Sequence, residues 1–550
     1  MHTVHRVLAV LAFLLGTTAV ANAATAGAAQ QENFAGRKAH ALDRARIAAL
    51  TTFVERSARA LGVPGVSIGI LEHGRTVFAG GFGVRALGKP QRVDADTLYL
   101  IASNTKPLTT LMLAKLVEEG KLDWETPVAD LLPQARLANA EATARLRLKH
   151  MVCACAGLPY RNLDWEFAPP DAPVSIALEI LARMTPMHAL GTKYTYSNPI
   201  AASAGLLGGH VAYPDLALGA AYDKAMATRV FAPLGMRRTT FDFNRATRGN
   251  HATSHGLTPT GALLAVPPAR DRQMRAVRAT GGAWSNVNDL LAYVRMELAG
   301  GLLANGRRYL PEAALKARWE RQVDTGPHSW YGLGLDTDLS SGTPVMHHGG
   351  RFYWQRSDLV WLPEHGVGLV ILMNASTGNV LMEAFPRKLL EVLFDGESRA
   401  EQMVAAAVAS EAGRSARERR TLHIPADPDH AAQLAPCYRS EWLGEIVVRR
   451  RGADVYFDFG SWEAPVASRR SAGTVEFIVL TASPPPPFVA GSSGGRRTLT
   501  IRDAVHVYPY VEAAEASTDA GRGPCIPSGA RRVPPVAHSA GSAPVRCGVF

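Results

Sequence analysis

The residues best suited to chemistry form the motif Ser103-Asn104-Thr105-Lys106, the only Ser-x-x-Lys in the chain. Leucine-rich sequence follows, so residues 103–119 are predicted to form a helix that begins at this serine. Residues three apart share a helical face, which brings the Lys106 amine towards the Ser103 hydroxyl. A serine needs a neighbouring base, and a lysine becomes one when burial lowers its pKa. The motif therefore predicts a nucleophile and its base, and the alternative is a helix-capping serine beside a surface lysine.

Two further motifs follow along the chain in a suggestive order. Tyr196-Ser197-Asn198 lies in a polar stretch before Pro199, and His347-His348-Gly349-Gly350 ends a predicted strand. Each also has a plain structural interpretation, as a turn and as a strand end. The order Ser-x-x-Lys, Tyr-x-Asn and His-x-Gly is what indicates a common site. His-x-Gly fits two registers, one starting at His347 and one at His348.

Other candidate motifs lack the setting that their chemistry needs. Ser67 lies in a Gly-x-Ser-x-Gly match, but in the middle of a predicted strand and not at a strand-to-helix turn. A second match, at residues 491–495, lies in a predicted Gly/Ser loop. His251 and His255 are four residues apart, but no Glu follows the first and no third ligand stands out. We therefore predict no metal site and no cofactor.

The elements that must position the three motifs are strands at the ends of the region and mostly helices between them. Helices are predicted at residues 42–61, 103–119, 223–231, 288–298 and 383–393, and strands at residues 66–71, 76–82, 345–348, 357–362 and 367–373. This is not the regular alternation of a parallel α/β sheet. It predicts an α+β domain whose antiparallel sheet is assembled from both ends of residues 24–396.

The amino-acid composition changes twice after residue 396. Residues 397–424 are rich in Ala, Glu and Arg and predict a linker helix. Residues 425–514 predict a small all-β domain, with strands at 445–449, 455–459, 474–480, 497–502 and 505–511. Residues 515–550 have almost no apolar periodicity and predict a disordered tail.

The N-terminal residues have the anatomy of a secretory signal. An apolar run at residues 7–20 follows Arg6 and precedes Ala21-Asn22-Ala23, which predicts a signal peptide over residues 1–23. No later segment offers 18 uncharged apolar residues, so we expect no integral membrane segment after cleavage and an exported protein, periplasmic or secreted. The net charge of +11 is spread over 550 residues without a basic and aromatic stripe, so no nucleic-acid partner is predicted.

The three motifs together resemble those of the serine β-lactamase-like hydrolases, which include class C β-lactamases, D-Ala-D-Ala peptidases, D-aminopeptidases and related esterases. The resemblance covers roughly residues 42–393, with supporting stretches such as Gly157-Leu158-Pro159 and Trp361-Leu362-Pro363-Glu364. It implies an antiparallel sheet flanked by helices, an all-helical lobe and an active site between them. The C-terminal β domain resembles the small barrel-like domains appended to some members.

The resemblance also implies a role for each motif residue. Ser103 is the acylated nucleophile, and Lys106 and Tyr196 share the work of base and proton shuttle. Asn198 holds Lys106 and the substrate amide. In the His-Gly-Gly register His348 and Gly350 face the substrate, and the backbone N–H groups of Ser103 and Arg351 form the oxyanion hole.

The chain departs from class C β-lactamases, which usually have Lys-Thr-Gly where this chain has His348-Gly349-Gly350. Histidine is mostly neutral at pH 7 and offers a substrate carboxylate little fixed charge. We therefore expect a peptidase acting on D-amino-acid peptides or an esterase, with small peptides, esters, β-lactams or peptidoglycan fragments as partners. A β-lactamase is the alternative, and a non-catalytic cell-wall or β-lactam-binding protein is the alternative of another class. The oligomeric state stays open.

The cysteines predict little. Cys153 and Cys155 are interpreted as small buried residues, because they are too close to bridge each other without strain. Whether Cys525 and Cys547 pair stays open.

Overall fold

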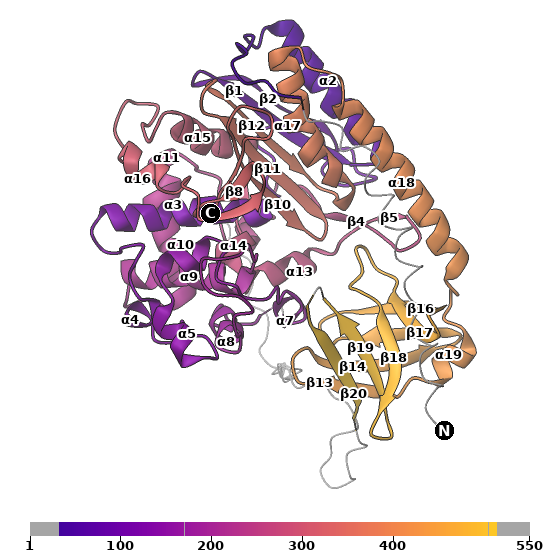
Figure 1. Cartoon of the computed structure of the whole chain (residues 1–550). Coiled ribbons are helices and arrows are strands. Elements are labelled where there is room, and N and C mark those ends of the chain that lie inside the picture. Colours follow the sequence, from indigo (N-terminus) through magenta and orange to yellow (C-terminus); the bar gives the residue numbers. More distant parts are fainter. Residues whose placement is uncertain (1–31, 170, 504, 514–550) are drawn as a thin grey trace, which may run out of the picture. The chain divides into compact units, whose positions relative to one another are not determined.

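Strands from two distant parts of the sequence form one antiparallel sheet in the computed structural model, which describes residues 32–169, 171–503 and 505–513 (Figure 1). The predicted signal peptide, the predicted tail, Cys525 and Cys547 lie outside these residues. The chain divides into two units. The first comprises the described residues up to Leu422 with Ile478–Pro487 and Arg502–Val507, and the second comprises the remaining described residues after Leu422.

The sheet of the first unit has eight strands in the order β2-β1-β12-β11-β10-β9-β8-β7. Neighbouring strands are antiparallel. The strands are β1 (Gly65–Glu72), β2 (Arg75–Gly83), β7 (Val323–Gly326), β8 (Ser329–Tyr331), β9 (Asp336–Asp338), β10 (Val345–Phe352), β11 (Gln355–Leu362) and β12 (Val367–Met373). The sheet thus joins the two ends of the region, as the sequence predicts.

Alternation along the strands divides the core of this unit in two. In β11, Leu359 and Trp361 join one buried apolar cluster, whereas Val360 and Leu362 join the other. Successive side chains of a strand point to opposite faces, so each cluster covers one face of the sheet.

Helices cover both faces. On one face α2 (Arg44–Ala60) and α17 (Asn379–Phe394) pack together and supply apolar residues to the cluster that contains Val360. On the other face α15 (Val287–Leu298) packs against β1, β11 and β12. The predicted helices at 42–61, 288–298 and 383–393 correspond to these three, with ends that differ by at most four residues.

Further helices form a lobe beside the sheet. Its main members are α3 (Thr105–Glu118), α9 (Asn198–Ala212), α10 (Leu218–Met226) and α14 (Arg278–Gly281), which contact one another. A π-helical turn, Ala227–Phe231, continues α10 where the sequence predicts a helix at 223–231. Helix α3 is buried on almost every side. A helix that is apolar all round belongs inside a protein, and α3 therefore fixes the position of the Ser-x-x-Lys motif firmly.

The second unit is built around a closed barrel of eight strands. The strands are β13 (Cys437–Ser440), β14 (Gly444–Arg451), β15 (Asp454–Asp458), β16 (Glu463–Ser471), β17 (Thr474–Val479), β18 (Phe488–Ser493), β19 (Arg496–Arg502) and β20 (Val507–Glu512). Helix α18 (Ala400–Thr421) precedes this unit, where the sequence predicts a linker helix. The fold class is confirmed, but the five predicted strands miss β13, β16 and β18. The loop predicted at residues 491–495 is wrong in its first half, since β18 extends to Ser493.

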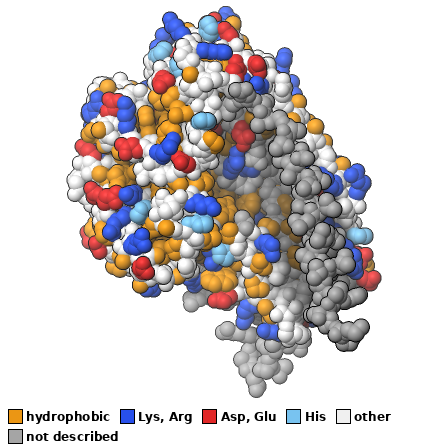
Figure 2. All heavy atoms as spheres, viewed as in Figure 1, with side chains coloured by type: hydrophobic (Ala, Val, Ile, Leu, Met, Phe, Trp, Pro, Cys, Tyr) orange, Lys and Arg blue, Asp and Glu red, His pale blue; other side chains and the backbone are white. Residues whose placement is uncertain are grey.

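The surface shown in Figure 2 carries acidic and basic side chains interspersed among hydrophobic ones. Among the described residues, no helix is both long and apolar enough to cross a membrane.

Candidate active site

Ser103 lies in a tight turn between a short strand and a buried helix. The turn is a 3₁₀ helix, Ala102–Asn104, which follows β3 (Tyr99–Leu100) and leads into α3, so the regular helix begins two residues later than predicted. Ala102 has a φ of 47°, in the left-handed region that residues other than glycine rarely adopt. Such a conformation costs about 1–3 kcal/mol and persists only where the surroundings enforce it.

Strand β11 holds this turn in place with buried polar side chains. Ser357 Oγ donates a hydrogen bond of 2.6 Å to the Ile101 carbonyl and accepts one of 2.8 Å from Asn104 Nδ2. The Gln355 side chain accepts a bond of 2.9 Å from the Leu100 amide. Hydrogen bonds of this kind, shielded from water, fix the strained turn and with it the Ser103 side chain.

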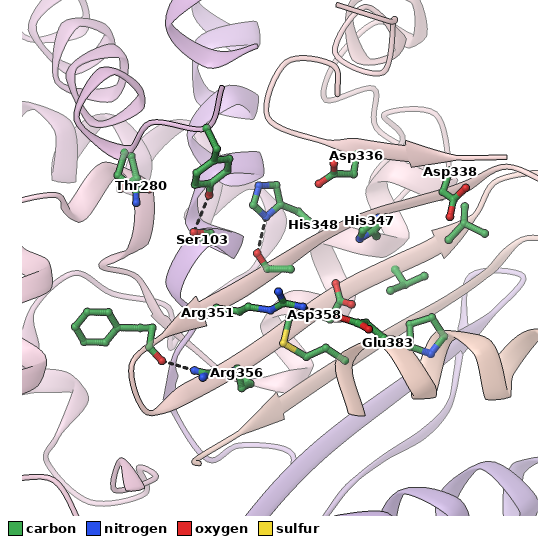
Figure 3. Close-up of a pocket in the computed structure, with 18 of the residues that line it drawn as sticks. Ser103, Thr280, Asp336, Asp338, His347, His348, Arg351, Arg356, Asp358 and Glu383 are labelled. Atoms are coloured by element: carbon green, nitrogen blue, oxygen red, sulfur yellow. Dashed lines mark hydrogen bonds and ion pairs between the residues drawn. The ribbon is translucent and has the colours of Figure 1, made fainter. Parts of the chain in front are cut away.

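The first two motifs meet at the hydroxyl of Ser103, which is labelled in Figure 3. Its Oγ lies within hydrogen-bond distance of Lys106 Nζ, at 3.0 Å, and of Tyr196 OH, at 2.9 Å. Lys106 Nζ also donates to Asn198 Oδ1 at 2.7 Å and to the Thr280 carbonyl at 3.2 Å. The structure therefore brings Ser103, Lys106, Tyr196 and Asn198 together, as the motif order predicts.

The protonation of the two groups around Ser103 follows from their burial. Burial lowers the pKa of Lys106 well below that of an ordinary lysine and raises the pKa of Tyr196 above that of an ordinary tyrosine. Desolvation disfavours the charged form of each group, so the neutral amine and the neutral phenol are the favoured forms. A neutral amine can take the Ser103 proton, and a phenol that touches the same oxygen can relay it.

Asn198 is oriented by an asparagine that the sequence did not reveal. Asn198 begins α9, and its Nδ2 donates to Asn162 Oδ1 at 3.0 Å. The indole of Trp165 donates to the same oxygen at 3.2 Å. Asn162 lies three residues after Gly157-Leu158-Pro159, but a single asparagine in a loop carries no pattern that could have marked it.

The structure distinguishes the two histidines of β10. His348 pairs with Leu359 and His347 with Val360, so the two side chains lie on opposite faces of the sheet. His348 is 2% exposed, and its Nε2 is 3.0 Å from Tyr331 OH. Burial, together with the charges of Lys106 and His347, lowers the pKa of His348 well below its usual value. His348 therefore lies on the Lys106 side, in the His-Gly-Gly register, as a neutral imidazole.

Gly350 is needed because β10 passes very close to the Ser103 turn. A Cβ atom there would lie 2.1 Å from Ser357 Oγ and 2.3 Å from the Ile101 carbonyl oxygen. The side chain of the next residue, Arg351, lies on the other face of β10, where it lines the cavity and pairs with Glu383 at 2.9 Å. Only the Arg351 backbone is thus left near the turn, which is the part that the predicted oxyanion hole requires.

These residues line one cavity of about 690 Å³, a size typical of small-molecule sites. Ser103, Tyr196, Asn198 and His348 lie on its wall, and aromatic, apolar and charged residues outside the three motifs line the rest. The cavity can hold a substrate whose carbonyl approaches Ser103.

The other candidates from the sequence lie in structural roles. Ser67 is buried in β1 and bonds to Tyr99 OH and to the Asp94 carbonyl. His255 is buried, with its ring between the Asn374 carbonyl and the Leu87 amide. Over the residues that the structure describes, no group of three or more His, Cys, Asp or Glu side chains is arranged to hold a metal ion.

The interpretation of Cys153 and Cys155 as separate buried residues is wrong, because they form a disulfide. Ala154 between them has a φ of 49°, and this left-handed turn sets the two Cα atoms 5.1 Å apart, within the range that a disulfide spans. The Ala154 carbonyl accepts a bond of 2.7 Å from the Thr195 amide. The disulfide loop therefore supports the segment that presents Tyr196.

Comparison with known protein families matches residues 48–393 to the family Beta-lactamase. Among curated proteins, the chain is 23% identical over 330 residues to the unguisins hydrolase ungD' of Aspergillus campestris, which covers 57% of this chain and 59% of that protein. The chain thus spans under two thirds of that relative.

Two solved structures are similar to this one. The octameric penicillin-binding protein homologue from Pyrococcus abyssi has a TM-score of 0.55 at 20% identity, over 84% of this chain and 99% of that one. A D-stereospecific amidohydrolase from Streptomyces sp. has a TM-score of 0.52 at 25% identity, over 64% of this chain and 99% of that one. With most of its length matched by the family, this chain belongs to the β-lactamase family and has the fold of the penicillin-binding proteins.

Proposed function

We propose that this protein is a serine hydrolase that forms an acyl-enzyme on Ser103 and hydrolyses an amide or ester bond. The observation that carries the proposal is that Lys106 and Tyr196 are both hydrogen-bonded to one serine oxygen. A serine activated by a base and held by a second proton carrier is the arrangement that nucleophilic catalysis needs.

The steps balance with groups of this chain alone. Ser103 Oγ attacks the substrate carbonyl while its proton passes to the Lys106 and Tyr196 pair. The oxyanion is stabilised by the amides of Ser103 and Arg351. The pair then returns the proton to the leaving amine or alkoxide as its bond to the carbonyl carbon breaks. Water loses a proton to the same pair and attacks the acyl carbonyl. The bond to Ser103 Oγ then breaks, the acid is released, and the pair returns the proton to Ser103 Oγ.

The neutral state of the His348 imidazole favours a peptidase or an esterase. A buried imidazole with a lowered pKa supplies no fixed positive charge beside the nucleophile for a substrate carboxylate. The similarity to a D-stereospecific amidohydrolase supports peptides of D-amino acids, such as fragments of peptidoglycan, as the class to test first. A β-lactamase stays the second candidate, because residues 48–393 match the family Beta-lactamase.

Export is the second part of the proposal. The apolar run and the Ala-x-Ala pattern at residues 7–23 support a protein that acts in the periplasm or outside the cell. Substrates with cell-wall chemistry are found there.

The test is a panel of p-nitrophenyl esters, D- and L-aminoacyl anilides and nitrocefin, assayed on one purified sample and on Ser103→Ala. We expect turnover of esters or D-aminoacyl anilides well above that of nitrocefin, and none with Ser103→Ala. Nitrocefin as the best substrate would favour the β-lactamase. A folded wild-type protein without turnover on any member would favour a binding protein.

A further inference from the structure

A cluster of acidic side chains lines the active-site cavity but has no part in the reaction described above. Asp336 of β9 lies directly opposite His347 of β10, and Asp358 of β11 lies directly opposite Gly349. Directly opposite residues of antiparallel strands share a face, with Cβ atoms about 4.5–5.5 Å apart. Asp336, His347 and Asp358 therefore share the face turned away from Ser103, and Asp338, two residues after Asp336, shares it too. We call the three aspartates the acidic cluster.

The acidic cluster and Ser103 belong to the same cavity. In Figure 3, Asp336, Asp338 and His347 lie on the side of His348 away from Ser103. Strand β9 pairs with β10 only as far as His347, and Gly349 contributes no side chain at the next position on this face. A substrate that leaves Ser103 can therefore cross the edge of β10 and reach the cluster.

Within the acidic cluster, the burial and hydrogen bonding of Asp358 indicate a missing partner. It is only 4% exposed, and its Oδ1 accepts no hydrogen bond from a described residue. Burial, against the opposing charge of His347, raises the pKa of Asp358 to about 7; the charge of Asp336 adds to this rise and that of Arg351 opposes it. Burial also raises the pKa of Asp336. A buried carboxylate is costly unless a cation pairs with it.

Other buried acids in this unit have such a cation or accept hydrogen bonds from neighbouring groups, as Asp271 does from Ser254 and Asp289 from Thr239. Glu297 receives a bond of 2.6 Å from Arg318, and Asp164 forms a close pair with Arg161. No ion pair joins Asp336 or Asp358 to any residue in the part of the chain that the structure describes. Asp358 thus differs from these acids, because its Oδ1 has neither an ion pair nor a hydrogen bond from a described residue. It also lines the cavity that the substrate would enter.

We propose that the acidic cluster is a substrate subsite that binds a primary ammonium group while the scissile carbonyl lies at Ser103. This inference rests on the proposed hydrolase function and adds a preference for cationic substrates. Arg351 and Arg356 form the next pair along the same face and repel a cation, so they confine it to the aspartate end. An organic ammonium fits better than a bare ion, since no trio of metal-ligating side chains occurs among the described residues.

The test compares substrates that differ only in one ammonium group. The first pair is Nα-acetyl-lysine and Nα-acetyl-norleucine p-nitrophenyl ester, with the charge on the acyl side. The second pair is the N-acetyl-alanine esters of 6-aminohexanol and hexanol, with the charge on the leaving group. We expect kcat/KM to be about tenfold or more higher for the charged member of at least one pair. Asp358→Asn keeps the shape of the side chain and should bring that ratio close to one.

The matched control is Glu383→Gln. Glu383 lies on the same cavity wall, but its carboxylate already has Arg351 as a partner. It should leave the charged-to-neutral ratio as in the wild type. Turnover of the neutral esters within about twofold shows that each variant is folded. A ratio near one for both pairs in the wild type, or an unchanged ratio in the Asp336→Asn/Asp358→Asn double variant, would overturn the proposal.

A binding measurement separates this proposal from the hydrolase proposal. Calorimetry on Ser103→Ala measures the dissociation constants of two amides. The constant for Nα-acetyl-lysine amide should be at least tenfold lower than that for Nα-acetyl-norleucine amide, whether or not the wild type turns over any ester. Equal affinities would contradict the subsite. Absence of turnover together with a preference for the lysine compound would contradict only the hydrolase.

Discussion

At the scale of single residues, the proposed mechanism depends on the protonation state of Lys106. The sequence places it three residues after Ser103, but only the structure shows it buried among Ser103, Asn198 and the Thr280 carbonyl. Pattern alone could not decide between a buried base and a surface lysine, because burial depends on helices that come from distant parts of the chain.

Lys106→Met is expected to lower kcat/KM for esters by about 10²–10⁴-fold, the usual contribution of a positioned general base. The melting temperature should fall little, because the variant replaces a buried amine with an apolar side chain of similar length. The measurement is ester turnover beside a thermal unfolding curve. Unchanged turnover in the folded variant would remove Lys106 from the mechanism.

The pH profile of the wild type follows from the same group. Since burial lowers the pKa of Lys106, its reactive neutral form persists to lower pH than in an ordinary lysine. kcat/KM should therefore be constant at high pH and fall as the pH drops through this lowered pKa. A profile that rises only near the pKa of a free lysine would contradict a buried neutral amine.

Substitutions of the two histidines of β10 should have different effects on the hydrolysis of neutral esters. His348 is buried beside Lys106, so His348→Ala should lower kcat/KM by about ten- to a thousandfold. His347 lies on the other face and is only partly buried, so His347→Ala should change neutral-ester kcat/KM by less than about threefold. Steady-state kinetics of both variants provides the test. The opposite pattern would mean that the register of β10 is shifted by one residue.

At the scale of elements, the sequence predicts best where one period dominates. Helices α2 and α15 and strands β11 and β12 lie within two residues of their predicted limits, because their apolar pattern is strong. Strands β16 and β18 were missed because they carry Pro, Arg, Gly and Ser, and closure of the barrel keeps them extended despite weak β propensity. The Cys153–Cys155 disulfide was missed because it depends on the left-handed φ of Ala154, which the residue type does not indicate.

The fit of β10 against the Ser103 turn gives a prediction at this scale. Gly350→Ala would put a Cβ atom into Ser357 Oγ and the Ile101 carbonyl, and overpacking of this kind costs about 1–3 kcal/mol. We expect a lower melting temperature and loss of most ester turnover, because the Ser103 turn must move.

Gly349→Ala is the matched control. A Cβ atom there would meet only Met382 Cε, at 2.9 Å, the end of a flexible side chain. This variant should stay close to the wild type in melting temperature. Equal destabilisation by both substitutions would show that strand geometry, and not the contact with the turn, decides the effect.

At the scale of the whole molecule, the order of the three motifs predicted both the family and the grouping of Ser103, Lys106, Tyr196 and Asn198. Asn162 and the acidic cluster depend on strand register and loop packing, which no local pattern encodes. The match over residues 48–393 places the family within the first unit.

Export gives a prediction for the complete chain. If residues 1–23 are a signal peptide, expression of the full sequence in a bacterium should yield a periplasmic or secreted protein that begins at Ala24. Intact-mass analysis of each cell fraction measures this. A full-length protein confined to the cytoplasm would contradict export.

The most direct test of the central claim is the site of acylation. After incubation with a fluorophosphonate or a penicillin probe, peptide mass spectrometry should find the probe on the peptide that contains Ser103. Ser103→Ala should abolish the label, whereas Ser67→Ala, which alters a serine held inside β1, should keep it. Label on any other serine, or equal labelling of Ser103→Ala, would contradict an acyl-enzyme at Ser103.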